Sequence, residues 1–275
     1  MSIYCIKNLI LDMDGVLWRG ETPMPGLTDF FTTLRHLDIG FVLATNNATK
    51  TAEQYAGKLA RFGVEISPAQ ILTSAEATAG YLSERYPPDT AVYVVGENGL
   101  RNAMETRAFR LISAEEAAAG ALAELVVVGF TRHATYMDLA MGALLIHKGA
   151  AFIGTNPDVS YPSELGPLPG AGSLLAMISA ATGVQPAIIG KPGPIIFREA
   201  LKRLGGSPDE TAMVGDRLST DIAGGNAAAL HTILLLSGIS SPDDIETTGI
   251  IPDMVLEDIT ALAEYLTQAC VSVNA

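Results

Sequence analysis

The feature that most constrains the fold is a repeated order of short apolar runs, polar turns and helical spacing. Residues 8–11 are mainly apolar and end at a polar turn, which predicts a buried strand, and apolar residues then recur at helical intervals over 27–37. Strands are likewise expected at 41–44, 211–214 and 231–236. Strands that alternate with helices pair in parallel, and strands that are apolar along their length are covered on both faces. We therefore predict an α/β fold built on a doubly wound, mainly parallel sheet.

The middle of the chain has strands and helices of its own. This stretch is long enough to form a separate domain inserted into the first one. We predict a core of residues 1–78 and 184–275, with an inserted α/β cap at 79–183. The strands expected in the cap are 91–95, 125–129 and 151–154, with a helix at about 135–148.

Charge and composition limit the class of partner. The chain has 275 residues and a formal net charge of −13, and an acidic surface repels nucleic acid and anionic membranes. No run approaches the ~18 apolar residues of a membrane span, and the charges at Lys7 and Asp12 come too early for a signal peptide. Cys5 and Cys270 form no metal-binding pattern. We expect a soluble, cytoplasmic protein that binds neither nucleic acid nor membrane.

Polar clusters follow four of the expected strands, and open α/β sheets bind ligands beyond the carboxyl ends of their strands. The first cluster is Asp12-Met13-Asp14-Gly15. Carboxylates at positions i and i+2 of a strand end can point the same way, and they suit a nucleophile and an acid/base partner. An ordinary polar turn uses the same residue types, so the motif alone leaves both interpretations open.

The second and third clusters offer groups that bind anions. Thr45, Asn46 and Asn47 precede an expected helix, and backbone N–H groups at a helix start bind anions. Ordinary helix capping explains the same residues. Lys191 stands between a glycine and a proline, where its ammonium is a fixed point charge for phosphate oxygens. A solvated surface lysine is the alternative.

The fourth cluster contains Asp216 and Asp221, at the end of the expected strand 211–214. Carboxylate oxygens on such a loop suit Mg²⁺, which takes few protein carboxylates and keeps several waters. Helix capping near the positive end of the helix dipole is the alternative. Each cluster is ambiguous by itself, but the order of all four along the chain is specific.

That order resembles the haloacid dehalogenase superfamily of phosphatases. The superfamily has a DxDG motif, a Thr or Ser after the second strand, a Lys, and a final GDxxxxD. The resemblance is closer to the subgroup of p-nitrophenyl phosphatases, NagD-like nucleotidases, phosphoglycolate phosphatase and pyridoxal phosphatase. It implies a Rossmann-like core with a large α/β cap inserted between the second and third motifs. The matching segments are Asp12–Glu21, Thr45–Asn47, Thr155–Asp158, Gly190–Pro192 and Gly215–Asp221.

The resemblance also implies a catalytic mechanism. Asp12 attacks phosphorus and becomes a phosphoaspartate, while Asp14 protonates the leaving oxygen and later deprotonates the attacking water. Mg²⁺ is bound by the Asp12 carboxylate, the Asp14 main-chain carbonyl and Asp216. The cation is needed because an anionic nucleophile must approach an anionic phosphate. Asp221 is expected to orient either the lysine or a metal-bound water.

The remaining roles concern the substrate, a small phosphorylated metabolite. Thr45, Asn46, Asn47 and Lys191 are expected to hold the phosphoryl oxygens. A phosphotransferase or mutase that uses the same intermediate stays open. A signalling receiver phosphorylated on aspartate fits less well, because an acid/base at Asp14 would destroy the phosphoaspartate that a receiver must preserve. Relatives in the subgroup often form dimers through the cap, so a homodimer is expected.

Tyr161 is the expected selectivity residue. It lies in a loop stiffened by two prolines, after the expected strand 151–154. In the pyridoxal phosphatases a histidine at the matching position contacts the substrate ring, and the tyrosine here argues against pyridoxal phosphate as the main substrate. Packing of a half-buried tyrosine is the alternative.

Overall fold

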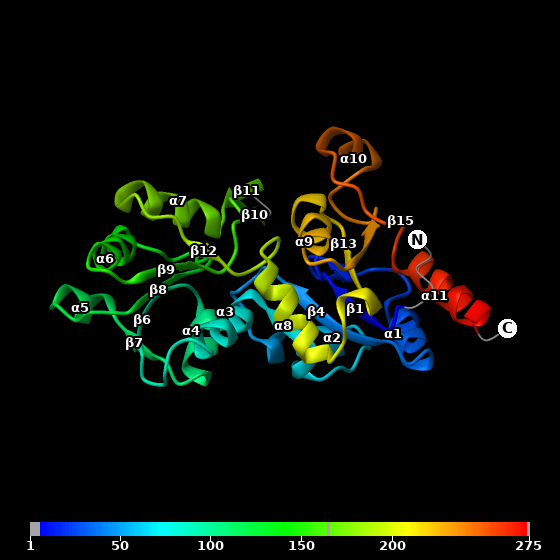
Figure 1. Cartoon of the computed structure of the whole chain (residues 1–275), viewed down its shortest axis with the longest axis horizontal. Helices are drawn as coiled ribbons and strands as arrows, with labels where there is room; N and C mark the ends of the chain where they lie inside the picture. The colour runs from blue at the N-terminus through cyan, green and yellow to red at the C-terminus, as the bar shows by residue number, and fades with distance from the viewer. Residues whose placement is uncertain (1–5, 164–165, 274–275) are drawn as a thin grey trace. The chain divides into compact units, whose positions relative to one another are not determined.

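The computed structural model describes residues 6–163 and 166–273, which divide into two compact units (Figure 1). The first unit contains the chain up to Thr45, Ala52–Leu72, and the chain from Lys191 onward. The second unit contains Asn46–Thr51 and Thr73–Gly190. The segment 79–183, expected from the sequence to be the cap, lies within the second unit, and its exact boundaries stay a prediction.

The first unit is built on a six-stranded sheet in the order β15-β14-β13-β1-β4-β5. Strand β1 pairs in parallel with both β13 and β4, so the N-terminal strand lies inside the sheet. In this register Leu11 is level with Val214 and with Leu43. The polar residues that follow these strands therefore leave the sheet at one edge. The strands are β1 (Asn8–Leu11), β4 (Gly40–Thr45), β5 (Ile71–Thr73), β13 (Thr211–Gly215), β14 (His231–Leu235) and β15 (Met254–Leu256).

Helices cover the sheet of the first unit. Leu9 and Leu11 share a hydrophobic cluster with Phe30 of α1 and Leu262 of α11, and helix α8 packs on β4 and β1. Burial of β1, β4, β13 and β14 explains why the sequences of these strands are mostly apolar. A short hairpin, β2 (Trp18–Arg19) and β3 (Thr22–Pro23), follows β1. The helices are α1 (Leu27–His36), α2 (Ala52–Arg61), α8 (Pro194–Leu204), α9 (Ala223–Ala227), α10 (Pro242–Thr248) and α11 (Ile259–Val273), with a π-helical turn at Leu218–Ile222.

The second unit has a five-stranded sheet in the order β12-β9-β8-β6-β7, and its pairs are parallel. A two-stranded antiparallel hairpin, β10 with β11, is separate from it. Among the described residues, no helix is long and apolar enough to cross a membrane. The strands are β6 (Ala91–Val95), β7 (Arg110–Ile112), β8 (Leu125–Val128), β9 (Ala151–Gly154), β10 (Ser160–Ser163), β11 (Gly166–Pro169) and β12 (Ala187–Ile188).

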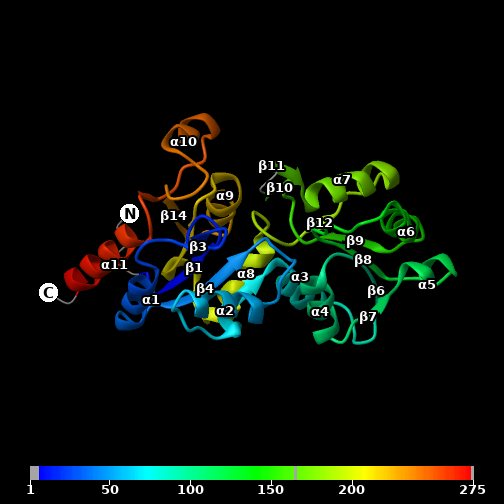
Figure 2. The ribbon, with the colours of Figure 1, turned by 180° about the vertical axis from the view of Figure 1, so that it is seen from behind.

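Helices α6 and α7 lie side by side on one face of this second sheet, and α4 lies on the other (Figures 1 and 2). Alternate strand residues such as Tyr93, Val126 and Phe152 join a cluster with Leu145 of α6 and Ile178 of α7. The predicted α/β class, with a parallel core sheet and a second α/β domain, is confirmed. The helices are α3 (Ser74–Ser83), α4 (Asn98–Thr106), α5 (Ala114–Ala118), α6 (Tyr136–His147) and α7 (Ala171–Thr182).

Candidate active site

The carboxyl edge of the six-stranded sheet gathers three aspartates. Asp12 follows β1 directly, and its backbone N–H donates to the carbonyl of Val214 in the neighbouring strand. Asp216 follows β13, and Asp221 lies in the π-helical turn that comes next. One carboxylate oxygen from each of the three lies within 4.8 Å of the others. Asp12 is at least 204 positions from the other two in sequence, and it joins them in one cluster because β1 and β13 are neighbours in the sheet.

Lys191 lies at the centre of this cluster. Its Nζ is 2.5 Å from Oδ1 of Asp12 and 2.7 Å from Oδ1 of Asp221. It also donates to the carbonyl oxygen of Ala44, near the end of β4, at 3.1 Å. The Lys191 side chain is only 3% exposed, so its charge is compensated by these carboxylates rather than by water. The sequence alternative of a solvated surface lysine is therefore wrong.

Burial and charge together shift the pKa values of the cluster. Burial raises the pKa of Asp12 well above its usual value, and Asp221 and Asp216 raise it further while Lys191 opposes them. Burial, with help from Asp221, raises the pKa of Asp216 to about 6. Burial alone would lower the pKa of Lys191, but Asp12 and Asp221 outweigh it and the net shift is upward. The cluster holds more negative charge than its single lysine can balance.

Glycines allow the chain to approach this charge closely. Gly15 has a φ of +88°, and a Cβ there would lie 2.3 Å from Oδ2 of Asp216. A Cβ at Gly238 would also clash with Asp216. The carboxylate of Asp216 is fixed by the N–H of Ile239 at 2.9 Å. The glycine of the DxDG motif is thus required both for its backbone conformation and for space beside a carboxylate.

The donor set fits a divalent cation. Three carboxylates and one ammonium leave a formal charge of −2 when all are ionised, and every donor is a hard oxygen of the kind that Mg²⁺ prefers. The pKa values of Asp12 and Asp216 are raised by burial first and by neighbouring aspartates second, and a divalent cation held by these carboxylates would oppose both shifts. Asp221 belongs to this cluster and contacts Lys191, which is the contact that its expected orienting role requires.

Asp14 projects into solvent two residues after Asp12. Its side chain is exposed, and its Oδ1 accepts a hydrogen bond of 2.8 Å from the indole Nε1 of Trp18. The expected acid/base residue therefore lies beside the expected nucleophile in sequence and has a defined donor.

The second cluster divides between the two units. Thr45 ends β4 and is buried, next to the Ala44 carbonyl that Lys191 contacts. In the second unit, the amide of Asn46 donates to Asp158 at 3.2 Å, and its backbone carbonyl accepts from Asn156 at 2.8 Å. Oδ1 of Asn47 accepts from the backbone N–H of Thr49 at 3.0 Å. The bond from Thr49 to Asn47 is a local turn ahead of α2, which begins at Ala52, whereas the Asn46 bonds reach the segment 156–158. A phosphate-binding role for Asn46 and Asn47 stays a prediction.

Tyr161 lies on β10 in the second unit, opposite Leu168 of β11. Its ring stacks on Phe130, with ring centroids 4.5 Å apart and an angle of 21° between the planes. The Tyr161 side chain is half-buried, so one face packs while the rest of the ring stays accessible. This geometry is compatible with both the selectivity role and the packing role.

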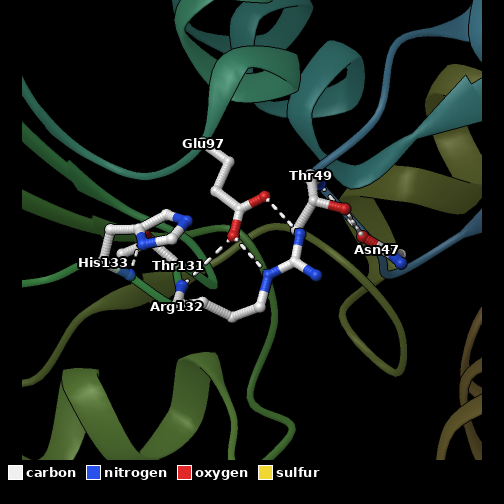
Figure 3. Close-up of polar contacts among 6 residues, drawn as sticks. All are labelled: Asn47, Thr49, Glu97, Thr131, Arg132 and His133. Carbon is white, nitrogen blue, oxygen red and sulfur yellow. Dashed lines mark hydrogen bonds and ion pairs between the residues drawn. The ribbon is translucent and has the colours of Figure 1, made fainter. Parts of the chain in front are cut away.

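A charged pair joins the loops that follow β6 and β8 (Figure 3). The guanidinium of Arg132 donates from Nε to Oε1 of Glu97 at 3.1 Å and from Nη2 to Oε2 at 3.0 Å. The backbone N–H of Arg132 also donates to Oε1 at 3.1 Å. Partial burial would raise the pKa of Glu97, but these bonds outweigh it and lower the pKa.

Glu97 and Arg132 are not among the residues predicted from the sequence. Both lie just beyond β6 and β8, strands that are predictable from the sequence, so the rule that ligands bind at strand ends points to them as it does to the aspartates. Trp18 was noticed as part of a motif but received no role.

The parallel core sheet and the aspartate cluster at its strand ends indicate an α/β enzyme with an acidic active site, and comparison with known proteins gives the family. Residues 9–110 match the haloacid dehalogenase-like hydrolase model, and residues 188–262 match a second model described as HAD-hydrolase-like. The acid sugar phosphatase of Staphylococcus epidermidis is 38% identical over 256 residues, which cover 93% of this chain and 96% of the relative.

Two solved structures share the architecture. The p-nitrophenyl phosphatase from Archaeoglobus fulgidus is 30% identical with a TM-score of 0.88, covering 94% of this chain and 99% of its own. The glycerol phosphate phosphatase from Mycobacterium tuberculosis, solved in complex with magnesium, is 32% identical with a TM-score of 0.86, covering 95% of this chain and 78% of its own.

The chain belongs to the haloacid dehalogenase-like hydrolases. The predicted subgroup, which includes NagD and the p-nitrophenyl phosphatases, is confirmed, and so is the prediction of a phosphatase that acts on phosphoric monoesters.

Proposed function

We propose that this phosphatase hydrolyses sugar phosphates and similar small phosphate monoesters through a phosphoaspartate on Asp12, with Mg²⁺ as cofactor. The observation that carries the mechanism is the contact of Asp12 with Lys191 inside the aspartate cluster. The substrate class is supported by the similarity to an acid sugar phosphatase, and the cofactor by the magnesium complex of a related phosphatase.

Asp12 is the nucleophile. Its position directly after a central strand gives it a rigid backbone, and its contact with Lys191 fixes its orientation. The same ammonium, which is buried and already charged, would hold a phosphoryl oxygen when substrate binds. Thr45 and the amides of Asn46 and Asn47 complete the proposed phosphate site.

Asp12, Asp216 and the main-chain carbonyl of Asp14 would hold the cation, which would offset the negative charge on the nucleophile and the phosphate. Asp221 would keep Lys191 in place through their 2.7 Å contact. This contact offsets part of the free energy that is needed to bury the two charges.

Asp14 supplies and removes protons. As the P–O bond to the leaving group breaks, its carboxyl proton moves to the departing oxygen, and the alcohol leaves. The resulting carboxylate then accepts a proton from the water that attacks the phosphoaspartate, which releases phosphate and restores both aspartates. Exposure of Asp14 to solvent is compatible with access of that water.

The test is a panel of phosphate monoesters assayed for inorganic phosphate in the presence of Mg²⁺. Sugar phosphates should be hydrolysed with higher kcat/KM than nucleotides or pyridoxal phosphate. Adding a free sugar as acceptor separates hydrolysis from phosphoryl transfer, because transfer would produce a new sugar phosphate instead of phosphate. Failure to release phosphate from any monoester would refute the proposal.

The expected homodimer and the expected cytoplasmic location are also predictions, and each has its own test. A homodimer should give twice the chain mass of 28.8 kDa in light scattering after size exclusion. A cytoplasmic location should be tested by cell fractionation with an antibody against the chain.

A further inference from the structure

Asp14, the proposed general acid, accepts a hydrogen bond whose purpose the proposed mechanism does not explain. Oδ1 of Asp14 accepts from Nε1 of Trp18 at 2.8 Å. Trp18 is fully buried, whereas Asp14 is exposed. A carboxylate exposed to water would ordinarily sample several rotamers, so a bond to a fixed donor restricts an otherwise mobile group.

The backbone between the two residues is closed into a tight loop. The N–H of Gly15 donates to the carbonyl of Trp18 at 2.8 Å, and the N–H of Leu17 donates to that of Met13 at 2.8 Å. Trp18 then pairs with Pro23 in the β2–β3 hairpin. The loop therefore fixes the indole relative to the Asp14 backbone.

The indole ring is held from several sides. It stacks on Tyr55, with centroids 6.3 Å apart, and meets Phe62 at 6.2 Å in a tilted contact. Nζ of Lys58 lies 4.4 Å from the ring centroid, in cation–π geometry, and donates to the carbonyl of Gly20 at 2.5 Å. Rotation of the ring would break these contacts together, so the N–H points at Asp14 persistently.

An indole nitrogen can donate a hydrogen bond but cannot accept one. Oδ1 of Asp14 therefore acts as the acceptor whether the carboxyl group is ionised or protonated. A protonated carboxyl oxygen is a weaker acceptor than the unprotonated one, so this bond favours the proton on Oδ2, the oxygen to which Trp18 does not donate.

Resting on the function proposed above, we propose that Trp18 is a positioning residue for the acid/base step. It holds the Asp14 carboxyl so that Oδ2 carries the proton to the leaving oxygen and later receives the proton of the attacking water. No bond is made or broken at the indole. Its contribution is orientation, which matters most when the leaving group needs a proton to depart.

A purely structural role for Trp18 makes a different prediction. Loss of packing would lower stability and slow every substrate alike. Loss of the N–H would slow esters of poor leaving groups, such as a sugar phosphate, but spare p-nitrophenyl phosphate, because p-nitrophenolate leaves without protonation. The two roles are thus separated by leaving-group dependence.

The first variant is Trp18→Phe, which keeps an aromatic ring and removes the donor. We expect kcat for a sugar phosphate to fall about tenfold, the size expected for a lost hydrogen bond to a charged group. Turnover of p-nitrophenyl phosphate should fall by less than about twofold, within the reach of a general packing loss. Phe62→Leu is the matched control, since Phe62 packs on the same ring without touching Asp14.

The second variant avoids a change of packing. Trp18 is the chain's single tryptophan, so growth with β-(3-benzothienyl)alanine in a tryptophan auxotroph replaces its N–H by sulfur at this position alone. The same selective loss should appear with an unchanged melting temperature. This readout holds even if Trp18→Phe folds poorly.

The Asp14→Asn background completes the experiment. If Trp18 acts through Asp14, its replacement should have no further selective effect once Asp14 is gone, so the two losses should not add. A uniform loss on both substrates, or full additivity, overturns the positioning role. If Asp14→Asn itself slows both substrates equally, the acid role of Asp14 fails, and the inference about Trp18 fails with it.

Discussion

Each unit of the molecule has a charged cluster where its parallel strands end, and the two clusters differ in balance. In the first unit, three aspartates surround one buried lysine, and the pKa values of Asp12 and Asp216 are raised. In the second unit, Glu97 and Arg132 form a one-to-one pair with two parallel hydrogen bonds, and the Arg132 side chain is 56% exposed (Figure 3).

This difference in charge balance distinguishes a candidate catalytic site from a structural ion pair. In the Glu97–Arg132 pair the charges are equal and opposite, so no further ion is needed to compensate them. The hydrogen bonds from Arg132 lower the pKa of Glu97. An unbalanced buried cluster is unfavourable in isolation and becomes favourable when a cation or a reacting group compensates it. The same strand-end position therefore carries a structural pair in one unit and candidate catalytic groups in the other.

The largest expected effect comes from removing one carboxylate of the unbalanced cluster. Asp12→Asn should reduce p-nitrophenyl phosphate turnover below about 1% of wild type, because an amide is nearly the same shape but is not nucleophilic. Glu97→Gln is the matched control, the same kind of change in the balanced pair, and should keep turnover near wild type. Residual activity of Asp12→Asn above that level, in a folded protein, would contradict covalent catalysis by Asp12.

Metal replacement is the next test. Chelation with EDTA should abolish activity, and Mg²⁺ should restore it. Ca²⁺ should inhibit, because it accepts more ligands than the octahedral Mg²⁺ and can engage both oxygens of Asp12, which would hold back the attacking one. Titration of steady-state activity with each cation decides this. Equal turnover with Ca²⁺, or full turnover in EDTA, would exclude the proposed cofactor role.

Much of the first unit could be predicted because its strands are short, apolar and buried. Residues 8–11 and 211–214 were placed within one residue of β1 and β13, and the strand-end rule then brought Asp12 and Asp216 together. Strand 91–95 and helix 135–148 of the second unit were equally readable, since β6 and α6 differ from them by at most one residue at each end.

Other features could not be predicted from the sequence because they depend on tertiary contacts. The β2–β3 hairpin consists of two-residue strands with no periodic pattern, so the bond from Trp18 to Asp14 left no sequence signal. The burial of Lys191 could not be decided from the sequence, where a phosphate ligand and a solvated surface lysine were both open, because only the fold brings carboxylates around it. The assignment of Thr45 to one unit and of Asn46 and Asn47 to the other is likewise a property of packing, because the three residues are contiguous in sequence.

A third test concerns selectivity in the second unit. Tyr161→Ala should change the ratios of kcat/KM among phosphate monoesters by roughly ten- to a hundredfold, the 1–3 kcal/mol range of a small pocket change, while p-nitrophenyl phosphate turnover falls little. Phe130→Leu is the control, because it removes the stacking partner but leaves Tyr161 in place. A uniform loss on all substrates with a lower melting temperature would assign Tyr161 to packing.

Neutralising one carboxylate should change the melting temperature in opposite directions in the two clusters. In EDTA, Asp216→Asn should melt about 2 °C or more above wild type, because it removes a repelling buried charge and ~1 kcal/mol corresponds to about 2–4 °C. The amide oxygen can still accept from the N–H of Ile239. Glu97→Gln should melt slightly below wild type, and only wild type and Glu97→Gln should gain stability from Mg²⁺. Destabilisation of Asp216→Asn in EDTA would show that the cluster is already balanced without a cation.

The smallest effect is the pH dependence of the Glu97–Arg132 pair. Partial burial opposes ionisation of Glu97, but the bonds from Arg132, aided by the nearby His133, lower its pKa below the ordinary value of 4.5. A glutamate whose pKa is lowered by folding stabilises the folded state above its unfolded pKa, and this stabilisation is lost as pH falls through the lowered value. The difference in unfolding free energy between wild type and Glu97→Gln should therefore be constant near neutral pH and shrink below 4.5. Because Arg132 is largely exposed, that difference should stay under about 1 kcal/mol. Urea unfolding at a series of pH values measures it, and a difference that grows as the solution is acidified would mean that the pair does not stabilise the ionised form of Glu97.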